Sequence, residues 1–412
     1  MKKCLLALLS LGLSVSLHAQ WNSLGSGVNT SSRKVYSLSV PGDGSLWGSV
    51  VHATFASGSP TVIHSTDNGT TWAVDALPGA GADENALAVF ARNADSAWVV
   101  TGNRPNFDQS KIYATTNGGT SWTEQAGPFN AAGHGLIGIH FFDGLTGIAY
   151  GSPSNVDSLR IYRTTDGGAN WTRLSPSLLP PLQAGEGVVY ASGNGACTAV
   201  GDDIWFATKA GRVWHSSDRG ENWTAASTGL NRLSSVAFRD AQHGIAVSDF
   251  GGGVRTSNGG LSWQPITLLP APSPVSVMYV PGTVGGYVIH DGIYNLSAFA
   301  FTADEGSTWV EENVAPSMDC MVFLSTTEGY GGANIVSGSV GGVYEWTGNL
   351  ATVASLDSRS FAEAGWTAGP NPTHDVLTLS WPDPAAGWPE VQILDLTGRP
   401  LPMPVPQRTG PQ

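Results

Sequence analysis

Three acidic residues lie near the ends of expected β-strands, where carboxyl groups can do acid–base chemistry. They are Asp143, Glu186 and Asp240. A two-carboxylate glycosidase needs an acid and a base that converge within about 5 to 10 Å. The sequence does not show whether any two of these carboxyl groups converge. Acids beside strand ends more often cap turns, so we favour that interpretation and predict no catalytic residue.

The chain carries no motif for metal or redox chemistry. It has 9 His and 3 Cys, and the spacing of His134 and His140 across an expected strand start does not indicate metal ligation. HExxH, CxxC, haem-attachment and calcium-loop patterns are absent, and no dinucleotide-type glycine fingerprint opens a helix. We therefore predict no metal site and no cofactor.

An eight-residue pattern, Ser/Thr-x-Asp/Asn-x-Gly-x-x-Trp, recurs at residues 65–72, 115–122, 164–171, 216–223, 256–263 and 302–309. In each copy we expect a tight hairpin turn in which the side chain at position three accepts hydrogen bonds from N–H groups two or so residues on. The glycine takes a positive φ, and the tryptophan folds over the turn. This logic indicates a structural role and not a ligand site. The residues concerned are Asp67, Gly69, Trp72, Asn117, Gly119, Trp122, Asp166, Gly168, Trp171, Asp218, Gly220, Trp223, Asn258, Gly260, Trp263, Asp304, Gly306 and Trp309.

The spacing of these copies predicts the architecture. Successive tryptophans of the pattern are 40 to 52 residues apart, from the differences of their positions. A step of about 40 to 50 residues is typical of one four-stranded propeller blade. Throughout residues 20–348, short β-branched and aromatic runs alternate with Gly, Asn, Asp and Ser clusters. The prediction is an all-β, seven-bladed β-propeller, with six blades as the alternative.

Both ends of this region are expected to close the ring. Strands without the pattern are expected at 320–324, 329–335 and 341–346, and residues 21–24 resemble the outer-strand segments that follow each copy. We expect 21–24 to complete the last blade, which removes an exposed sheet edge. The fourth blade is expected to begin at Gly185. Cys197 and Cys320 then fall in distant blades, so we expect free, mostly buried thiols.

Residues 1–19 predict a signal peptide. Lys2 and Lys3 precede an apolar run at 5–17 that is too short for a membrane span, and small or polar residues follow at 18–20. We expect an exported protein in the periplasm, on the cell surface or in the medium. Removal of the two lysines changes the formal charge from −13 to −15. With 12% charged residues, this acidic balance argues against nucleic acid and anionic membranes as partners, and we expect a monomer without membrane insertion.

Segments outside the pattern carry a family resemblance. Residues 136–151, 185–193, 233–247 and 275–282 follow one another in an order that resembles the YCF48-like propellers, related to the photosystem II stability and assembly factor. The pattern itself resembles the Asp-box or BNR repeats of sialidases and of propellers without activity. The resemblance implies a sialidase-like fold. It also implies a non-catalytic binding or assembly scaffold for protein or glycan, with the ligand at the central propeller face.

A glycoside hydrolase of sialidase-like fold is the alternative. A sialidase needs an arginine triad, a Tyr–Glu pair and usually a Phe/Tyr-Arg-Ile-Pro motif near the first blade, where this chain offers only residues 32–35, Ser-Arg-Lys-Val. Arg160, Arg163, Arg212 and Arg255 are expected in or beside third strands, nearer the rim than the central mouth. The sequence leaves open whether any hydrolase activity remains.

A second unit follows the expected propeller. Residues 349–365 are polar and weakly patterned, as in a linker. Within 366–412, residues 369–372 (GPNP), the alternating run 376–379 and residues 391–399 (VQILDLTGR) resemble the C-terminal sorting domain of type IX secretion in Bacteroidetes. That resemblance implies a β-sandwich, of which we expect only about half here. Whether the short tail still directs secretion is left open.

Overall fold

The computed structural model describes two parts of the chain separately. It covers residues 20–350, except 29–31, 53, 55–58, 104–106, 108, 130, 132, 154–157, 190–195, 269–275, 291–298, 313–317 and 337–339, and it covers 367–369 and 378–380. One unit is His18–Leu350, and the other combines Met1–Leu17 with Ala351–Gln412. The expected signal peptide lies outside the described residues, as do most of the expected linker and tail. Their boundaries therefore stay predictions.

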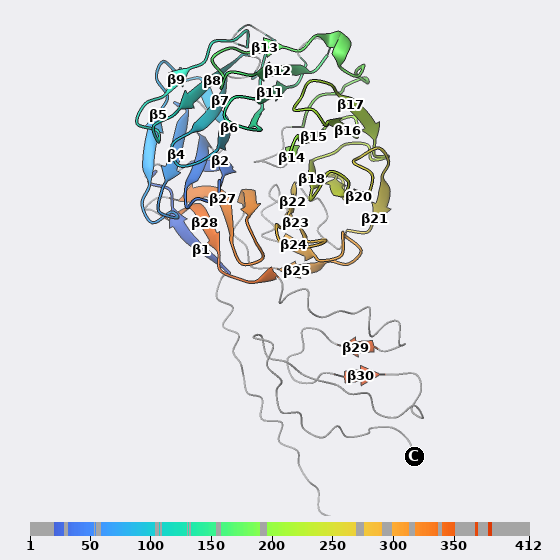
Figure 1. The fold of residues 1–412 in the computed structure, drawn as a ribbon. Helices are drawn as coiled ribbons and strands as arrows, with labels where there is room; N and C mark the ends of the chain where they lie inside the picture. Colours follow the sequence, from blue (N-terminus) through green and yellow to red (C-terminus); the bar gives the residue numbers. More distant parts are fainter. Residues whose placement is uncertain are drawn as a thin grey trace, which may run out of the picture. The chain divides into compact units, whose positions relative to one another are not determined.

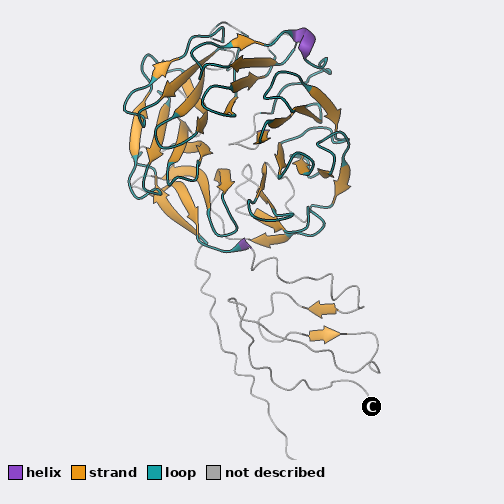
Figure 2. Cartoon of the chain, viewed as in Figure 1, coloured by secondary structure: helices purple, strands orange, loops and turns teal. Residues whose placement is uncertain are grey.

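The larger unit is built from antiparallel sheets arranged around a ring (Figures 1 and 2). Five sheets have four strands each, which pair in chain order. They are β6 (Glu84–Ala91), β7 (Ala97–Asn103), β8 (Ser110–Thr115) and β9 (Thr123–Glu124); β10 (Gly138–Phe141), β11 (Gly147–Gly151), β12 (Arg160–Thr164) and β13 (Thr172–Arg173); β14 (Cys197–Val200), β15 (Asp203–Ala207), β16 (Arg212–Ser216) and β17 (Thr224–Ser227); β18 (Ser235–Phe238), β19 (Gly244–Val247), β20 (Gly253–Thr256) and β21 (Gln264–Ile266); and β22 (Ser276–Tyr279), β23 (Tyr287–His290), β24 (Phe299–Thr302) and β25 (Val310–Glu312).

A sixth, eight-stranded sheet joins the two ends of the ring. Its strands are β1 (Trp21–Gly25), β2 (Arg33–Ser39), β3 (Leu46–His52), β4 (Thr61–Ser65), β5 (Ala73–Ala76), β26 (Met318–Phe323), β27 (Gly329–Val336) and β28 (Val340–Trp346). The prediction of a β-propeller is confirmed. The count of seven blades depends on dividing this sheet into two blades, and it stays a prediction.

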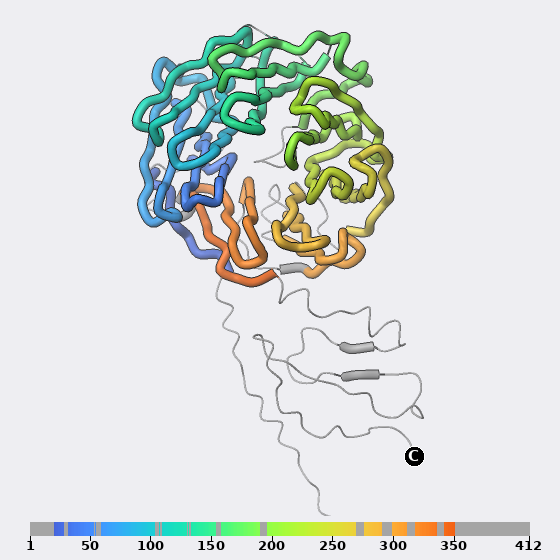
Figure 3. Tube along the Cα trace, viewed as in Figure 1, coloured from blue at the N-terminus to red at the C-terminus, as the bar shows by residue number. Residues whose placement is uncertain are grey.

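The N-terminal strand closes the ring as expected. β1 pairs antiparallel with β28, with Trp21 opposite Trp346, and Figure 3 shows the blue start of this unit beside its orange end. The rings of Trp21 and Trp346 are 5.3 Å apart, and both pack edge-on against Phe299 and Phe323. A second link was not expected: β2 pairs with β27 through Arg33 and Lys34. These two pairings make the closure a continuous sheet.

The core lies between neighbouring sheets. Second strands such as β7 are buried along almost their whole length, whereas outer strands such as β9 are exposed. One cluster joins Trp47 and Val62 of the first sheet to Val99 and Trp122 of the next. Continuous apolar runs therefore form second strands because both of their faces are covered.

The start of the fourth blade differs from expectation. Residues 185–189 form no strand, and their only described bridge to the sheet joins Val188 to Thr208. The first strand of that sheet is β14, which begins at Cys197. The side chain of Glu186 turns into the sheet and binds Arg212 there.

The second unit has a single described pair of strands. β29 (Thr367–Gly369) pairs antiparallel with β30 (Thr378–Ser380). The expected strand at 376–379 overlaps β30, but the other segments that resemble a sorting domain lie outside the described residues. The tail as a sorting domain therefore stays a prediction. In the described parts of the chain, which include the short helix η1 (Pro176–Leu178), no helix has the length and apolarity to cross a bilayer.

Candidate functional site

A cavity of about 240 Å³ lies among the first strands of the sheets, at the centre of the ring. Five first strands, β2, β6, β10, β14 and β26, supply most of its wall. Its described lining residues are Tyr36, Ser37, Ser39, Val40, Leu87, Ala88, Val89, Phe90, Ile137, Gly138, Ile139, His140, Tyr150, Val189, Ala196, Cys197, Thr198, Ala199 and Val322. They include no Asp, Glu, Lys or Arg. The wall combines aliphatic and aromatic side chains with hydroxyl groups and the imidazole of His140, and such a mixture is usual for a binding pocket.

Among the lining residues, His140 has the side chain best suited to bind a ligand through hydrogen bonds. Its ring lies edge-on between Phe90 and Phe142, with both centroid distances 4.9 Å. Burial lowers the pKa of His140 to about 4, so its imidazole is neutral at pH 7. The described residues offer its ring nitrogens no hydrogen-bond partner. A neutral imidazole here presents one donor and one acceptor to the cavity.

The thiol of Cys197 also lines this cavity. It is free, as expected, and burial raises its pKa to about 12, although a hydrogen bond with Tyr150 opposes that shift. The thiol is therefore protonated at neutral pH and is a poor nucleophile. Cys320 is buried and free as well, so the expectation of two unpaired thiols is confirmed.

Two of the three candidate acids cap turns between first and second strands, here called inner turns. Asp143 accepts hydrogen bonds from the N–H groups of Leu145 and Thr146 at 2.8 and 2.6 Å. Asp240 does the same for Gln242 and His243, both at 2.8 Å. These bonds satisfy turn donors, as the turn interpretation predicts. Neither residue lines the cavity.

Glu186 is a buried structural carboxylate. Arg212 donates to both of its oxygens, Trp214 and Thr208 donate at 2.9 Å each, and so does the N–H of Gln183. Burial raises the pKa of Glu186, but hydrogen bonds led by that of Arg212 outweigh burial and lower it. With five hydrogen-bond donors around it, this carboxylate is not available as a catalytic acid.

The six copies of the pattern form the turns between third and fourth strands. In every copy the N–H of position five donates to the hydroxyl of position one, at 2.8 to 3.1 Å. The side chain of position three accepts the N–H of position seven, at 2.8 to 3.0 Å. The donor thus lies four residues on, and not two as expected, because the N–H of position five, two residues on, already donates to the hydroxyl of position one. All six glycines have positive φ, from 79° to 97°.

These turns also hold neighbouring sheets together. A Cβ on Gly69 would lie 2.5 Å from Leu24 of β1, and one on Gly220 would lie 2.6 Å from Ile148 of the preceding sheet. Trp98 donates to the carbonyl of Gly167 across the same kind of boundary at 3.1 Å, as Trp205 does to Gly259 at 3.0 Å. Glycine is needed both for its φ and for this close approach.

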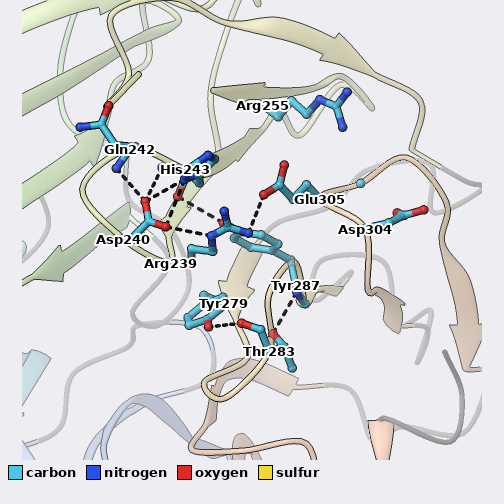
Figure 4. Close-up of polar contacts among 12 residues, drawn as sticks. Arg239, Asp240, Gln242, His243, Arg255, Tyr279, Thr283, Tyr287, Asp304 and Glu305 are labelled. Carbon is cyan, nitrogen blue, oxygen red and sulfur yellow. Dashed lines mark hydrogen bonds and ion pairs between the residues drawn. The ribbon is translucent and has the colours of Figure 1, made fainter. Parts of the chain in front are cut away.

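Sequence reasoning missed the role of position four. In all six copies its N–H donates to a carbonyl of the inner turn of the same sheet, at 2.8 to 3.0 Å. Its φ is positive in every copy, including Arg219 at 58° and Glu305 at 57°. Arg219 pairs with Asp143 at 2.6 Å, and Glu305 pairs with Arg239 at 2.6 Å, each in the preceding sheet (Figure 4 shows the second pair). The sequence held one signal for this role, the charged residues Arg219 and Glu305 at position four. Their positive φ, which is unfavourable for such residues, is seen only in the structure.

The four arginines considered for a sialidase triad lie in third strands, as expected. Arg163 and Arg255 contact the following copy of the pattern, through Glu221 at 2.8 Å and Ser307 at 3.0 Å. Arg160 binds the carbonyl of Gly133, and Arg212 binds Glu186. None of the four lines the cavity. Among the residues that the structure describes, no cluster of His, Cys, Asp or Glu is placed to hold a metal ion.

Comparison with known proteins identifies the fold. No protein-family model and no curated protein sequence matches the chain. A solved structure of YCF48 bound to D1 peptide is similar, with a TM-score of 0.57, 16% identity, and coverage of 80% of this chain and 96% of that one. YCF48 from Cyanidioschyzon merolae gives a TM-score of 0.56 at 14% identity, covering 79% and 98%. The chain is a YCF48-like β-propeller in fold.

A glycoside hydrolase structure is also similar. The GH74 enzyme of Niastella koreensis has a TM-score of 0.51 and 16% identity, and the match covers 74% of this chain and 52% of the enzyme. The match therefore spans about half the length of that enzyme. At these identities the likeness shows the fold alone, and the choice between binding and hydrolysis depends on the residues of the site.

Proposed function

We propose that this chain is a non-catalytic propeller that binds an extended segment of another protein at its central cavity, as part of an assembly or delivery process. The observation that carries the proposal is the chemistry of the cavity wall, whose described residues are apolar or neutral. The candidate acids are engaged elsewhere: Asp143 and Asp240 in inner turns, and Glu186 with Arg212. A glycosidase needs two carboxyl groups facing one substrate.

The likeness to YCF48 supports protein over glycan as the ligand. One of the similar structures is YCF48 bound to D1 peptide, so a propeller of this shape holds a polypeptide. The aliphatic and aromatic part of this wall suits side chains of a polypeptide, and its hydroxyl groups and His140 can add hydrogen bonds to the bound segment.

Binding and turnover can be measured on the same purified protein. The mature chain is screened against a peptide library and against a panel of sialosides and polysaccharides, with product analysis for each glycan. We expect peptides that bind reproducibly and no glycan product. Release of a reducing sugar that is lost in an Asp143→Asn or Asp240→Asn variant whose melting temperature is unchanged would establish the hydrolase instead.

Export is a separate part of the proposal. We propose that the chain is exported through its N-terminal segment, in which Lys2 and Lys3 precede an apolar run at 5–17. Residues 366–412 resemble a sorting domain of type IX secretion, and fractionation of a type IX-competent host tests whether they direct the protein further. Release into the medium that is lost on deletion of residues 370–412 would show that they do, and release that is unchanged by the deletion would show that they do not.

A further inference from the structure

We propose that the central cavity accepts one uncharged aromatic side chain of the bound polypeptide and that His140 is its hydrogen-bond partner. This inference rests on the proposed function, which it sharpens by naming the anchoring group. Three features support it: the volume of the cavity, the lack of charged residues in its described wall, and the ring nitrogens of His140, which have no hydrogen-bond partner among the described residues.

The volume of the cavity suits a single ring. The cavity volume is about 240 Å³. An engineered apolar cavity of about 150 Å³ holds benzene. The space here is therefore sufficient for a phenyl or phenol ring with its attachment, and it is too small for several side chains or an oligosaccharide.

The uncharged wall favours uncharged rings over rings that carry a charged group. No ionisable residue of the described wall carries a charge at neutral pH, because the imidazole of His140 is neutral and the thiol of Cys197 is protonated. A charged group would lose its hydration on entering and find no opposite charge on this wall. An uncharged ring loses little hydration and gains contact with Phe90 and the neighbouring aliphatic side chains.

His140 supplies the specificity. Its ring is fixed by edge-on contacts with Phe90 and Phe142, while its nitrogens have no hydrogen-bond partner among the described residues. A polar group held rigidly and left unpaired gains most from a ligand that completes its hydrogen bond. A phenol hydroxyl or an indole N–H can do this, and a plain phenyl ring cannot.

Small ring compounds test the pocket directly. Binding of p-cresol, toluene, p-toluate and benzylamine to the full chain is measured by ligand-observed NMR and calorimetry. We expect p-cresol and toluene to bind, with p-cresol tighter by about three- to tenfold, the value of one net hydrogen bond. The anion and the cation should bind at least about tenfold more weakly than toluene. Equal binding of charged and uncharged rings, or no binding of any ring, would overturn the inference.

Two variants locate the binding. Ala199→Phe fills the cavity from β14, and Ala73→Phe adds the same ring to the exposed outer strand β5 as its control. Ring binding should be lost in the first and kept in the second. His140→Phe preserves the shape of the wall, so it should keep toluene binding but lose the preference for p-cresol. An unchanged preference in His140→Phe would show that His140 is not the partner, even if Ala199→Phe does not fold.

Peptide binding separates this inference from the proposed function. If wild-type protein binds peptides and Ala199→Phe binds them equally well while folded, the inference is wrong and the proposed function stands. If the rings bind and no polypeptide does, the proposed function is wrong, and the assignment of the ring to a polypeptide side chain falls with it.

Discussion

The turn end of the ring and its central cavity use polar groups in opposite ways. At the turn end, here the inner turns together with the six pattern turns, carboxylates such as Asp143 and Asp218 are surrounded by donors of the ring itself. In the cavity, the described wall has no charged residue, and His140 has no hydrogen-bond partner among the residues that the structure describes. Polar groups satisfied within the fold stabilise it, whereas an unsatisfied group facing a cavity is free to bind a ligand. We therefore assign stability to the turns, and our proposal assigns recognition to the central cavity.

The largest expected effect comes from opening the ring. Deletion of residues 21–28 removes β1, its pairing with β28 and the buried ring of Trp21. An exposed sheet edge and a broken aromatic cluster should lower the melting temperature by several degrees or cause aggregation. Thermal unfolding and light scattering measure this. Melting identical to that of the wild type would show that closure by β1 contributes little.

Removal of the buried carboxylate should have the next largest effect. Glu186→Ala leaves the guanidinium of Arg212 buried without its partner, which should cost roughly 3 to 5 kcal/mol in the free energy of unfolding. Asp143→Ala removes one side of an exposed pair with Arg219 and should cost clearly less. Denaturant unfolding of both variants tests the ranking. A larger loss in the free energy of unfolding for Asp143→Ala than for Glu186→Ala would show that Asp143, and not Glu186, is the more important structural acid.

Within one pattern turn, the tryptophan should matter more than the acid. Trp223 is buried against Phe206, so Trp223→Ala should cost about 3 to 5 kcal/mol through the cavity it leaves. Asp218→Ala removes hydrogen bonds to the hydroxyl of Ser216 and to Asn222, and it should cost about 1 to 2 kcal/mol. Denaturant unfolding again measures both. Equal losses in the free energy of unfolding for the two variants would contradict the prediction that packing of the tryptophan contributes more than the hydrogen bonds of the acid.

A smaller effect should appear in acid. Hydrogen bonds from Asn170 lower the pKa of Asp166, and Thr71 does the same for Asp67. A carboxylate with a lowered pKa in the folded state stabilises it above the unfolded pKa, near 3.8, and that contribution is lost as pH falls through the folded value. Amide protection factors in these two turns, corrected for the intrinsic exchange rate, should fall below about pH 4. The turns at Asn117 and Asn258 do not titrate and serve as internal controls.

The repeating part of the molecule was predictable because its information is local. Ser65, Asp67, Gly69 and Trp72 lie within one turn, so the sequence alone predicts both the turn and its glycine conformation. Closure by residues 21–24 was predictable because these residues resemble the other outer strands. The position of the fourth blade's first strand was not, because residues 185–189 and 197–200 both carry residues typical of strands, and only the folded sheet shows that 197–200 pairs with β15.

The cavity could not be predicted for a related reason. Phe90, His140 and Thr198 lie in three different sheets, and their sequence neighbours look like those of ordinary core strands. Only the ring brings them around one space. The role of position four was missed because the pattern leaves that residue unspecified, although Arg219 and Glu305 occupy it with charge.

One measurement tests the division between the two regions most directly. The affinity of a selected peptide is determined for wild type, Asp218→Ala and His140→Phe, under conditions in which all three are folded. The account predicts that Asp218→Ala is less stable but binds as tightly as wild type, while His140→Phe is as stable as wild type but binds a Tyr-containing peptide about three- to tenfold more weakly. Weakened binding in Asp218→Ala with full binding in His140→Phe would place recognition at the turns and contradict the account.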